Sequence, residues 1–337
     1  MRPKPLTLGV LIAIAVVAGQ ALLIPLFAAP AANLAPRDLP LAVAGPPQLA
    51  AQLEAQHPGA FEITQVADPA AADLKIKDRA VYGAIVVTAS GPEVHVASAA
   101  SPTVARLLTQ AAAGLGATAP PTGSPGSGGG TVPVRDVVPV DPDDPLGAGF
   151  GAGFLPLAIT SLLAGVLVYF LVPRRGARLA ALVTFGALAG LAGAAVQVEW
   201  LGILPDHYLA VAGSLGLFAL AVSAAMTGLA ALAGRAGLAL GAVVMFLVGN
   251  ALSGIAAAPE LLPQPWGAVG QWLPIGAGGT LLRSAAYFDG HGGRLAVTVL
   301  SAYAIGGLIL VLIGRDRIAG RTEVVPVEAA PELAGAH

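Results

Sequence analysis

Hydrophobic residues form one run at the start of the chain and five runs in its second half. Each run reaches the roughly 20 mainly apolar residues that a helix needs to cross a bilayer, and none contains Lys, Arg, Asp or Glu. Residues 30–148, between the first and second runs, are polar and hold most of the acidic residues. The pattern predicts an α-helical integral membrane protein with six transmembrane helices. The predicted spans are Leu6–Ala28, Gly151–Val172, Leu179–Val198, Tyr208–Ala231, Gly237–Ala257 and Leu295–Gly314.

Lys and Arg are distributed unevenly between the two ends of these spans. They are retained on the cytoplasmic side of short loops, and an internal N-terminus leaves only Arg283 and Arg294 in the short outer loops. We therefore expect a multi-pass plasma-membrane protein with both termini cytoplasmic, residues 30–148 extracytoplasmic and a cytoplasmic tail at 315–337. The cations then inside are Arg2, Lys4, Arg174, Arg175, Arg178, Arg235, Arg315, Arg317 and Arg321.

The first span has a second interpretation, as a secretory signal peptide. Met1-Arg-Pro-Lys precedes it, and Ala28-Ala-Pro-Ala-Ala resembles a small-residue cleavage site. The apolar run is longer than the roughly 7–15 residues of a signal core. An uncleaved anchor at 1–29 is the favoured interpretation, and cleavage is the alternative.

The polar region alternates between strand-like and helix-like spacing of its apolar residues. This predicts a small extracytoplasmic α/β domain at 30–116, inserted between helices 1 and 2. Residues 117–131 are rich in Gly, Pro and Ser and predict a flexible tether, and Val132–Pro145 predicts an extended approach to the membrane. A tether and extended segment at 117–148 would hold the domain loosely. The expected strands are Leu39–Ala44, Phe61–Val66, Val81–Thr88 and Val94–Ala97, and the expected helices are Gln48–His57, Pro69–Asp78 and Pro102 to about Leu115.

Candidate chemistry is sparse along the chain. No lysine follows a glycine as a phosphate-binding loop requires, no Gly-x-Ser-x-Gly is present, and the chain has no cysteine. His57, His95, His207 and His291 are widely spaced and predict surface or loop positions rather than a zinc site. Asp141-Pro-Asp143-Asp144 lacks calcium-loop spacing. We therefore expect no enzyme activity, no cofactor, no metal and no nucleic-acid partner.

The predicted bundle of five helices at 149–314 also lacks the intramembrane ionisable group that usually serves an ion-coupled transporter as its relay. Small residues allow helices to approach closely in membranes. Gly186 and Gly190 form such a pattern, and Gly306 and Gly307 would allow the same in the last span. The bundle is expected to be tightly packed.

The outer loop at 258–293 is apolar but contains too many prolines to span the membrane as one helix. Its tryptophans suit the headgroup level of a bilayer. It predicts a re-entrant or interfacial segment covered by other protein. The candidate residues of this outer-loop cap are Asn250, Pro259, Glu260, Pro263, Trp266, Gln271, Trp272, Pro274 and Arg283.

Several short motifs together resemble the type 2 ABC exporter permease-like proteins, particularly the branch that contains phage infection proteins. In the outer loop they are Asn250–Gly254, Pro259-Glu-Leu-Leu-Pro-x-x-Trp266, Gly270-Gln-x-Leu-Pro274, Leu281-Leu-Arg-Ser284 and Tyr287-Phe288. In the polar domain they are Leu39–Gly45, Arg79-x-x-Tyr82-Gly83-Ala84 and Ala97-Ser-Ala-Ala-Ser-Pro102.

This resemblance implies a permease-like subunit that helps to export an apolar or envelope-directed substrate. It implies a separate ATP-binding subunit and a homo- or hetero-dimer in the lipid bilayer. The alternative is a non-transporting envelope or secretion-accessory protein whose outer domain binds a partner.

Overall fold

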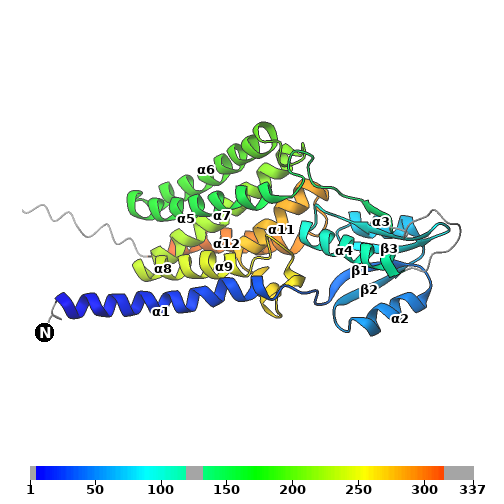
Figure 1. Cartoon of the computed structure of the whole chain (residues 1–337). Coiled ribbons are helices and arrows are strands. Elements are labelled where there is room, and N and C mark those ends of the chain that lie inside the picture. The colour runs from blue at the N-terminus through cyan, green and yellow to red at the C-terminus, as the bar shows by residue number, and fades with distance from the viewer. Residues whose placement is uncertain (1–4, 119–131, 315–337) are drawn as a thin grey trace, which may run out of the picture.

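The computed structural model describes residues 5–118 and 132–314. It is mainly helical, with a bundle of long helices and a sheet domain at one end of that bundle (Figure 1). The long helices of the bundle are α5 (Ala148–Leu171), α6 (Arg175–Ala194), α7 (Tyr208–Ala233) and α12 (Arg294–Ile313). A π-helical stretch, η1 (Ala195–Trp200), continues α6.

Five helices are long and apolar enough to cross a membrane: α1 (Pro5–Ala32), α5, α6 with η1, α7 and α12. The expected span Gly237–Ala257 is not among these five helices. Its helix covers only Arg235–Ala251, because the Ser253 hydroxyl bonds the Asn250 carbonyl and Gly254 turns the chain with φ of 64°. Six spanning helices are therefore not confirmed. This shorter helix consists of α8 (Arg235–Gly241), η2 (Ala242–Val248) and α9 (Gly249–Ala251).

Helix α7 lies at the centre of the bundle and packs against α5, α6, α11 (Pro274–Tyr287) and α12. Glycines permit two of these crossings. Gly190 of α6 lies against the backbone of α7 at Ala212 and Gly216, and Gly307 of α12 lies against α7 at Ala224. Gly306, in contrast, faces open space. Only one of the two adjacent glycines in the last span therefore makes the close approach expected of both.

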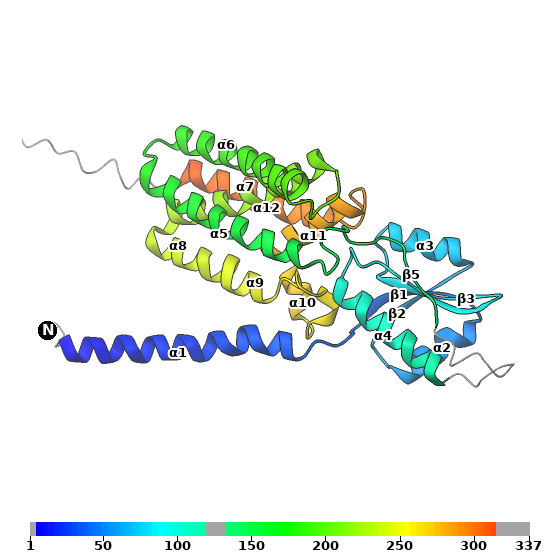
Figure 2. The same ribbon diagram turned by 45° about the horizontal axis from the view of Figure 1, so that its top comes forward.

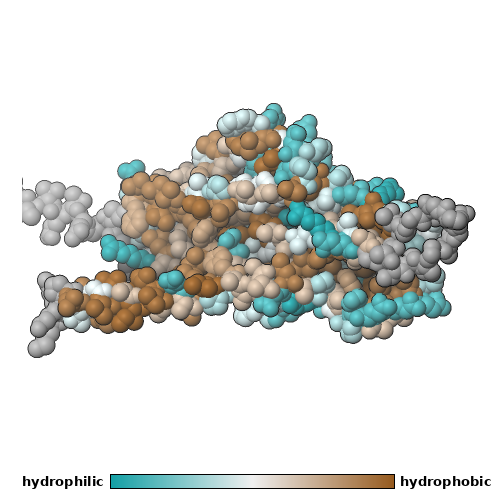
Figure 3. Space-filling model, viewed as in Figure 1, coloured by the Kyte–Doolittle hydropathy of each residue, from teal (hydrophilic) through white to brown (hydrophobic). Residues whose placement is uncertain are grey.

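Helix α1 stands apart from the other helices (Figures 1 and 2). Leu6 to Ala29 are exposed or partly exposed, and Pro30 in its last turn is buried. The helix is strongly apolar and almost fully exposed, its visible face in Figure 3 is mostly brown, and a helix of this kind suits the interior of a bilayer. Lipid or a second subunit would have to cover it.

The sheet domain contains five strands in the order β2-β1-β3-β4-β5. β1 is parallel to β2 and β3, β3 and β4 form an antiparallel hairpin, and β5 is parallel to β4. Side chains alternate across β1, so Leu39 and Leu41 pack with α4 while Ala42 and Ala44 pack with α3. The elements are β1 (Leu39–Ala44), α2 (Pro47–Gln56), β2 (Phe61–Val66), α3 (Pro69–Lys77), β3 (Gly83–Thr88), β4 (Gly91–Val96), α4 (Pro102–Thr118) and β5 (Val134–Asp136).

The segment after residue 131 is part of this domain, which corrects the expected loose connection. Val134 pairs with Val94 in the sheet, and the Val137 N–H donates to the Val96 carbonyl at 2.8 Å. Asp144 then accepts from the N–H groups of Gly149 and Phe150 in the first turn of α5, a favourable place for a carboxylate. Of the expected tether at 117–131, residues 117 and 118 belong to the helix Pro102–Thr118, and residues 119–131 lie outside the described residues.

The basic helix ends lie away from the sheet domain (Figure 1). Arg175 begins α6 and donates to the Leu312 carbonyl at the end of α12 at 2.9 Å. Arg178 is buried beneath the α5–α6 turn, where its Nε donates to the Val172 carbonyl at 2.7 Å. If the positive-inside rule holds, this end is cytoplasmic and the sheet domain is outside. That orientation remains a prediction.

Candidate functional site

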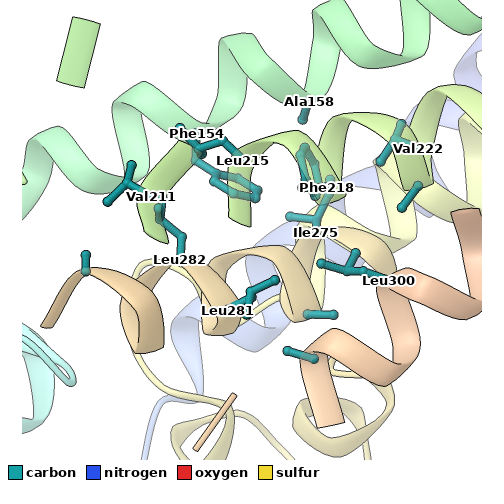
Figure 4. Packing of buried hydrophobic residues seen from close by; sticks show 14 of the residues in the cluster. Phe154, Ala158, Val211, Leu215, Phe218, Val222, Ile275, Leu281, Leu282 and Leu300 are labelled. Carbon is teal, nitrogen blue, oxygen red and sulfur yellow. The ribbon is translucent and has the colours of Figure 1, made fainter. Parts of the chain in front are cut away.

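The chain between α9 and α12, residues 252–293, connects the membrane bundle with the sheet domain; we call it the outer segment. It contains η3 (Pro259–Leu261), α10 (Trp266–Gly270) and α11. Helix α11 enters the bundle, where Ile275 and Leu282 pack with Phe154 and Phe218 (Figure 4). The rings of Phe154 and Phe218 are 4.5 Å apart between centroids. One end of the outer segment is therefore part of the bundle core.

The other end of the outer segment supports the sheet domain. Its backbone carbonyl groups accept hydrogen bonds from domain side chains: Ser101 Oγ donates to Ala257 O at 2.7 Å, and Thr103 Oγ1 to Ala256 O at 3.2 Å. Arg37, in the link from α1 to β1, donates from Nη1 to the Leu261 carbonyl at 2.8 Å. Leu261 is itself buried in the core beneath α4. The domain and the outer segment thus pack directly against each other. We call the region where they meet the junction.

Two motifs that are far apart in sequence meet at this junction. The Tyr82 hydroxyl donates to Glu260 Oε2 at 2.8 Å, and Arg79 Nη1 donates to the Thr280 carbonyl at 2.8 Å. Arg79 follows the end of α3 with φ of 55°, a backbone conformation that is unfavourable for residues with side chains. Its side-chain stem lies against Gly292, and its guanidinium is 5.6 Å from the centroid of the Phe288 ring.

Arg283 lies deeper, on α11, and is only 7% exposed although it was expected in an outer loop. Its Nη2 donates to the Ile255 carbonyl at 2.9 Å, and its guanidinium is 4.4 Å from the centroid of the Phe150 ring. Burial lowers the pKa of Arg283 to about 10, so it remains charged at neutral pH. Burial also lowers the pKa of Arg79, while Tyr82 and Glu260 act in the opposite direction.

A cavity of about 360 Å³ opens at the junction. One wall comes from the sheet domain, a second from the outer segment, and the floor from the start of α12. Trp272 and Leu295 lie beside the cavity and are 60% and 45% exposed. Its lining is Pro40, Arg79, Ala80, Val81, Tyr82, Ala100, Pro259, Glu260, Gln264, Ala268, Gln271, Trp272, Thr280, Gly292, Leu295 and Ala296.

The structure brings together some of the residues proposed for the outer-loop cap. Pro259, Glu260, Gln271 and Trp272 line the cavity, with Arg283 close by in the junction. Gln271 donates to the Ser253 carbonyl and accepts from the Thr280 hydroxyl.

The remaining cap candidates lie outside the cavity lining. Asn250 is in α9, Pro263 precedes α10, and Trp266 in α10 is half exposed. Pro274 begins α11 and is buried. Arg79, Tyr82 and Thr280 of the cavity lining are not among the cap candidates, although Arg79-x-x-Tyr82 is one of the motifs of the polar domain.

His95 corrects the expectation of surface or loop histidines, since it is 1% exposed within the sheet domain. Its Nδ1 lies 2.6 Å from Asp73 Oδ1 of α3, and Arg135 of β5 lies 3.2 Å from the other Asp73 oxygen. These contacts join α3, β4 and β5. Within residues 5–118 and 132–314, no group of three or more His, Cys, Asp or Glu side chains is arranged to hold a metal ion.

No family model, curated protein or solved structure matches the chain. Conclusions about function therefore depend on the geometry of the junction and on general physical principles.

Tyr82→Phe is expected to reduce the loss of stability at alkaline pH. Burial, reinforced by the Glu260 carboxylate, raises the pKa of Tyr82, so the folded protein retains a proton that the unfolded chain loses above about pH 10. The stability that the raised pKa of Tyr82 contributes is complete below that pH. It declines above it, by at most about 1.4 kcal/mol per pH unit. Thermal unfolding in detergent from about pH 8 to about pH 11 measures it.

Burial raises the pKa of Tyr287 to about 12. The Tyr82→Phe variant should therefore still lose some stability at alkaline pH, because it retains Tyr287. At neutral pH, Tyr82→Phe should lower the free energy of unfolding by about 1 kcal/mol, because the hydrogen bond from Tyr82 to Glu260 is lost. Equal alkaline slopes in the wild type and in Tyr82→Phe would show that Tyr82 is not buried at the junction.

Proposed function

We propose that this protein is a permease-like subunit of a membrane exporter. It would work with a separate ATP-binding subunit, as part of a homo- or hetero-dimer, and help to move an apolar or envelope-directed substrate outward. The proposal is supported by the contacts of the outer segment, which is attached to the bundle at one end and to the sheet domain at the other. Helix α11 packs against α7 and α12, and residues preceding it accept hydrogen bonds from the sheet domain. A movement of the bundle would therefore reach the outer domain.

A second candidate function is a non-transporting envelope or secretion-accessory protein whose outer domain binds a partner. The connection between α5 and α6 favours it. Only Val172, Pro173 and Arg174 separate these helices, and Arg178 is buried against the turn rather than presented outward. Such a short turn offers little surface on which an ATP-binding subunit could dock.

Site-specific photocrosslinking at the basic end of the bundle distinguishes these functions. Ala177 and Ala236 are exposed there and can carry a photoreactive residue, with exposed Ala70 of the sheet domain as the matched control position. The exporter proposal predicts that Ala177 or Ala236, but not Ala70, crosslinks to a protein with a phosphate-binding loop. It also predicts that the purified pair hydrolyses ATP faster than the ATP-binding subunit alone.

The exporter proposal would be contradicted if only Ala70 formed crosslinks and neither Ala177 nor Ala236 crosslinked to an ATP-binding protein. That result would support the second function.

A further inference from the structure

The lining of the cavity at the junction combines polar and apolar side chains. Arg79, Tyr82, Glu260, Gln271 and Thr280 supply charges and hydrogen-bonding groups. Apolar residues complete the lining, and Leu295 and Ala296 among them are in the first turn of α12. Such a lining suits a molecule that has a polar head and an apolar body.

Arg79 retains hydrogen-bonding capacity toward the cavity. A guanidinium has five N–H donors, and the only hydrogen bond of this group within the described residues is that from Nη1 to the Thr280 carbonyl. No ion pair with a carboxylate within 4.0 Å joins it there. The contacts with Gly292 and Phe288 hold the side chain in place. The remaining donors are therefore available to an acceptor in the cavity.

The charge balance favours an anionic acceptor. Arg79 lines the cavity, and Arg283, just outside the lining, lies close enough for the Arg79 charge to help lower its pKa. Glu260 is the one acidic residue in the cavity lining, and one of its oxygens already accepts from Tyr82. Arg79, Arg283 and Glu260 together carry one net positive charge, and a guanidinium binds phosphate or carboxylate oxygens with strong, paired hydrogen bonds.

The position of the opening favours a membrane component over a soluble anion. Leu295 is in the first turn of the membrane-crossing helix α12 and is exposed, as is Trp272 beside it. Tryptophan is enriched at the headgroup level of bilayers. A cavity of about 360 Å³ is at the lower end of the range for ligand sites. It has space for a headgroup, while acyl chains would lie outside along Trp272 and Leu295.

We propose that the junction cavity binds the acidic headgroup of a membrane amphiphile, with Arg79 as the residue that holds the anion. The binding depends on the bundle lying in a membrane but not on transport. It can be measured on the purified full chain without an ATP-binding subunit, so its failure and the failure of the exporter proposal are distinguishable.

Lipid binding to the detergent-purified chain, followed by native mass spectrometry, tests the proposal. The probes are phosphatidylglycerol, phosphatidylcholine with matched acyl chains, and inorganic phosphate. We expect phosphatidylglycerol to bind about tenfold more tightly than phosphatidylcholine, and Arg79→Gln to remove that preference. Arg135→Gln is the matched control because Arg135 is on the sheet domain with its side chain 63% exposed, and it should retain the preference.

Ala268→Phe provides a variant that leaves Arg79 intact and fills the cavity, and it should weaken the binding of both lipids. Inorganic phosphate should not displace phosphatidylglycerol. Equal affinity for the two lipids would overturn the proposal, as would an unchanged preference in a folded Arg79→Gln variant. Displacement by inorganic phosphate at comparable concentrations would assign the cavity to a soluble anion and overturn it as well.

Discussion

Gly307→Ala is expected to lower the free energy of unfolding by about 3 kcal/mol. A Cβ atom at Gly307 would overlap the backbone of α7 at Ala224 and Ala225, and neither helix can relieve a backbone overlap by rotating a side chain. Helices α7 and α12 would have to move apart along their contact. Thermal and chemical unfolding in detergent micelles would measure the change.

Gly306→Ala is the matched control, one position earlier in the same helix. A Cβ atom there meets nothing within 4 Å, and alanine favours a helix over glycine by roughly 0.5–1 kcal/mol. The control should therefore be as stable as the wild type or slightly more stable. Similar losses in the two variants would mean that α12 presents a different face to α7.

Phe218→Ala is expected to cost about 3 kcal/mol and to loosen the outer segment. The Phe218 side chain is fully buried between α5 and α11, and its ring packs against that of Phe154 (Figure 4). Its removal leaves a cavity that these helices can fill only by shifting. We expect faster proteolysis of the outer segment in the variant than in the wild type.

Phe170→Ala is the control for that experiment, since Phe170 is also a phenylalanine of the bundle but is 48% exposed. Its truncation should change the free energy of unfolding by no more than about 0.5 kcal/mol. If Phe218→Ala left the proteolysis of the outer segment unchanged, α11 would not be anchored in the bundle core.

Most elements of the sheet domain could be predicted from local patterns. Leu39–Ala44 and Phe61–Val66 are strands at the predicted positions, because apolar runs bounded by turn residues leave few alternatives. The third strand begins two residues later than predicted, at Gly83. The start of this strand is set by its partner, because Gly83 pairs with Val96 at the end of β4.

Three features could not be predicted because they depend on contacts with distant residues. Val134–Asp136 is too short to signal a strand and is held by β4. The helix from Arg235 ends at Ala251, although apolar residues continue beyond it, because Gly254 turns the chain. His95 is buried by α3 and β5, which no spacing along the sequence indicates.

The candidate site could be predicted only in part, for the same reason. Composition and prolines singled out the outer segment, and Glu260 and Trp272 of that prediction line the cavity. The partners of these residues come from the sheet domain, and 178 positions separate Tyr82 from Glu260. Such a pairing is specified by tertiary packing rather than by any local pattern. The motif Arg79-x-x-Tyr82 was visible, but its position at the cavity was not.

The sheet domain rests directly on the outer segment, and disulfide crosslinking across the junction probes this contact. The chain has no cysteine of its own. Thr103 and Ala256 meet through a hydrogen bond of 3.2 Å, whereas exposed Ala70 is in the first turn of α3, on the opposite face of the sheet from Thr103. In oxidised membranes, the pair Thr103→Cys and Ala256→Cys should crosslink rapidly and nearly completely, and the pair Thr103→Cys and Ala70→Cys should not. Equal and slow crosslinking of the two pairs would contradict the account.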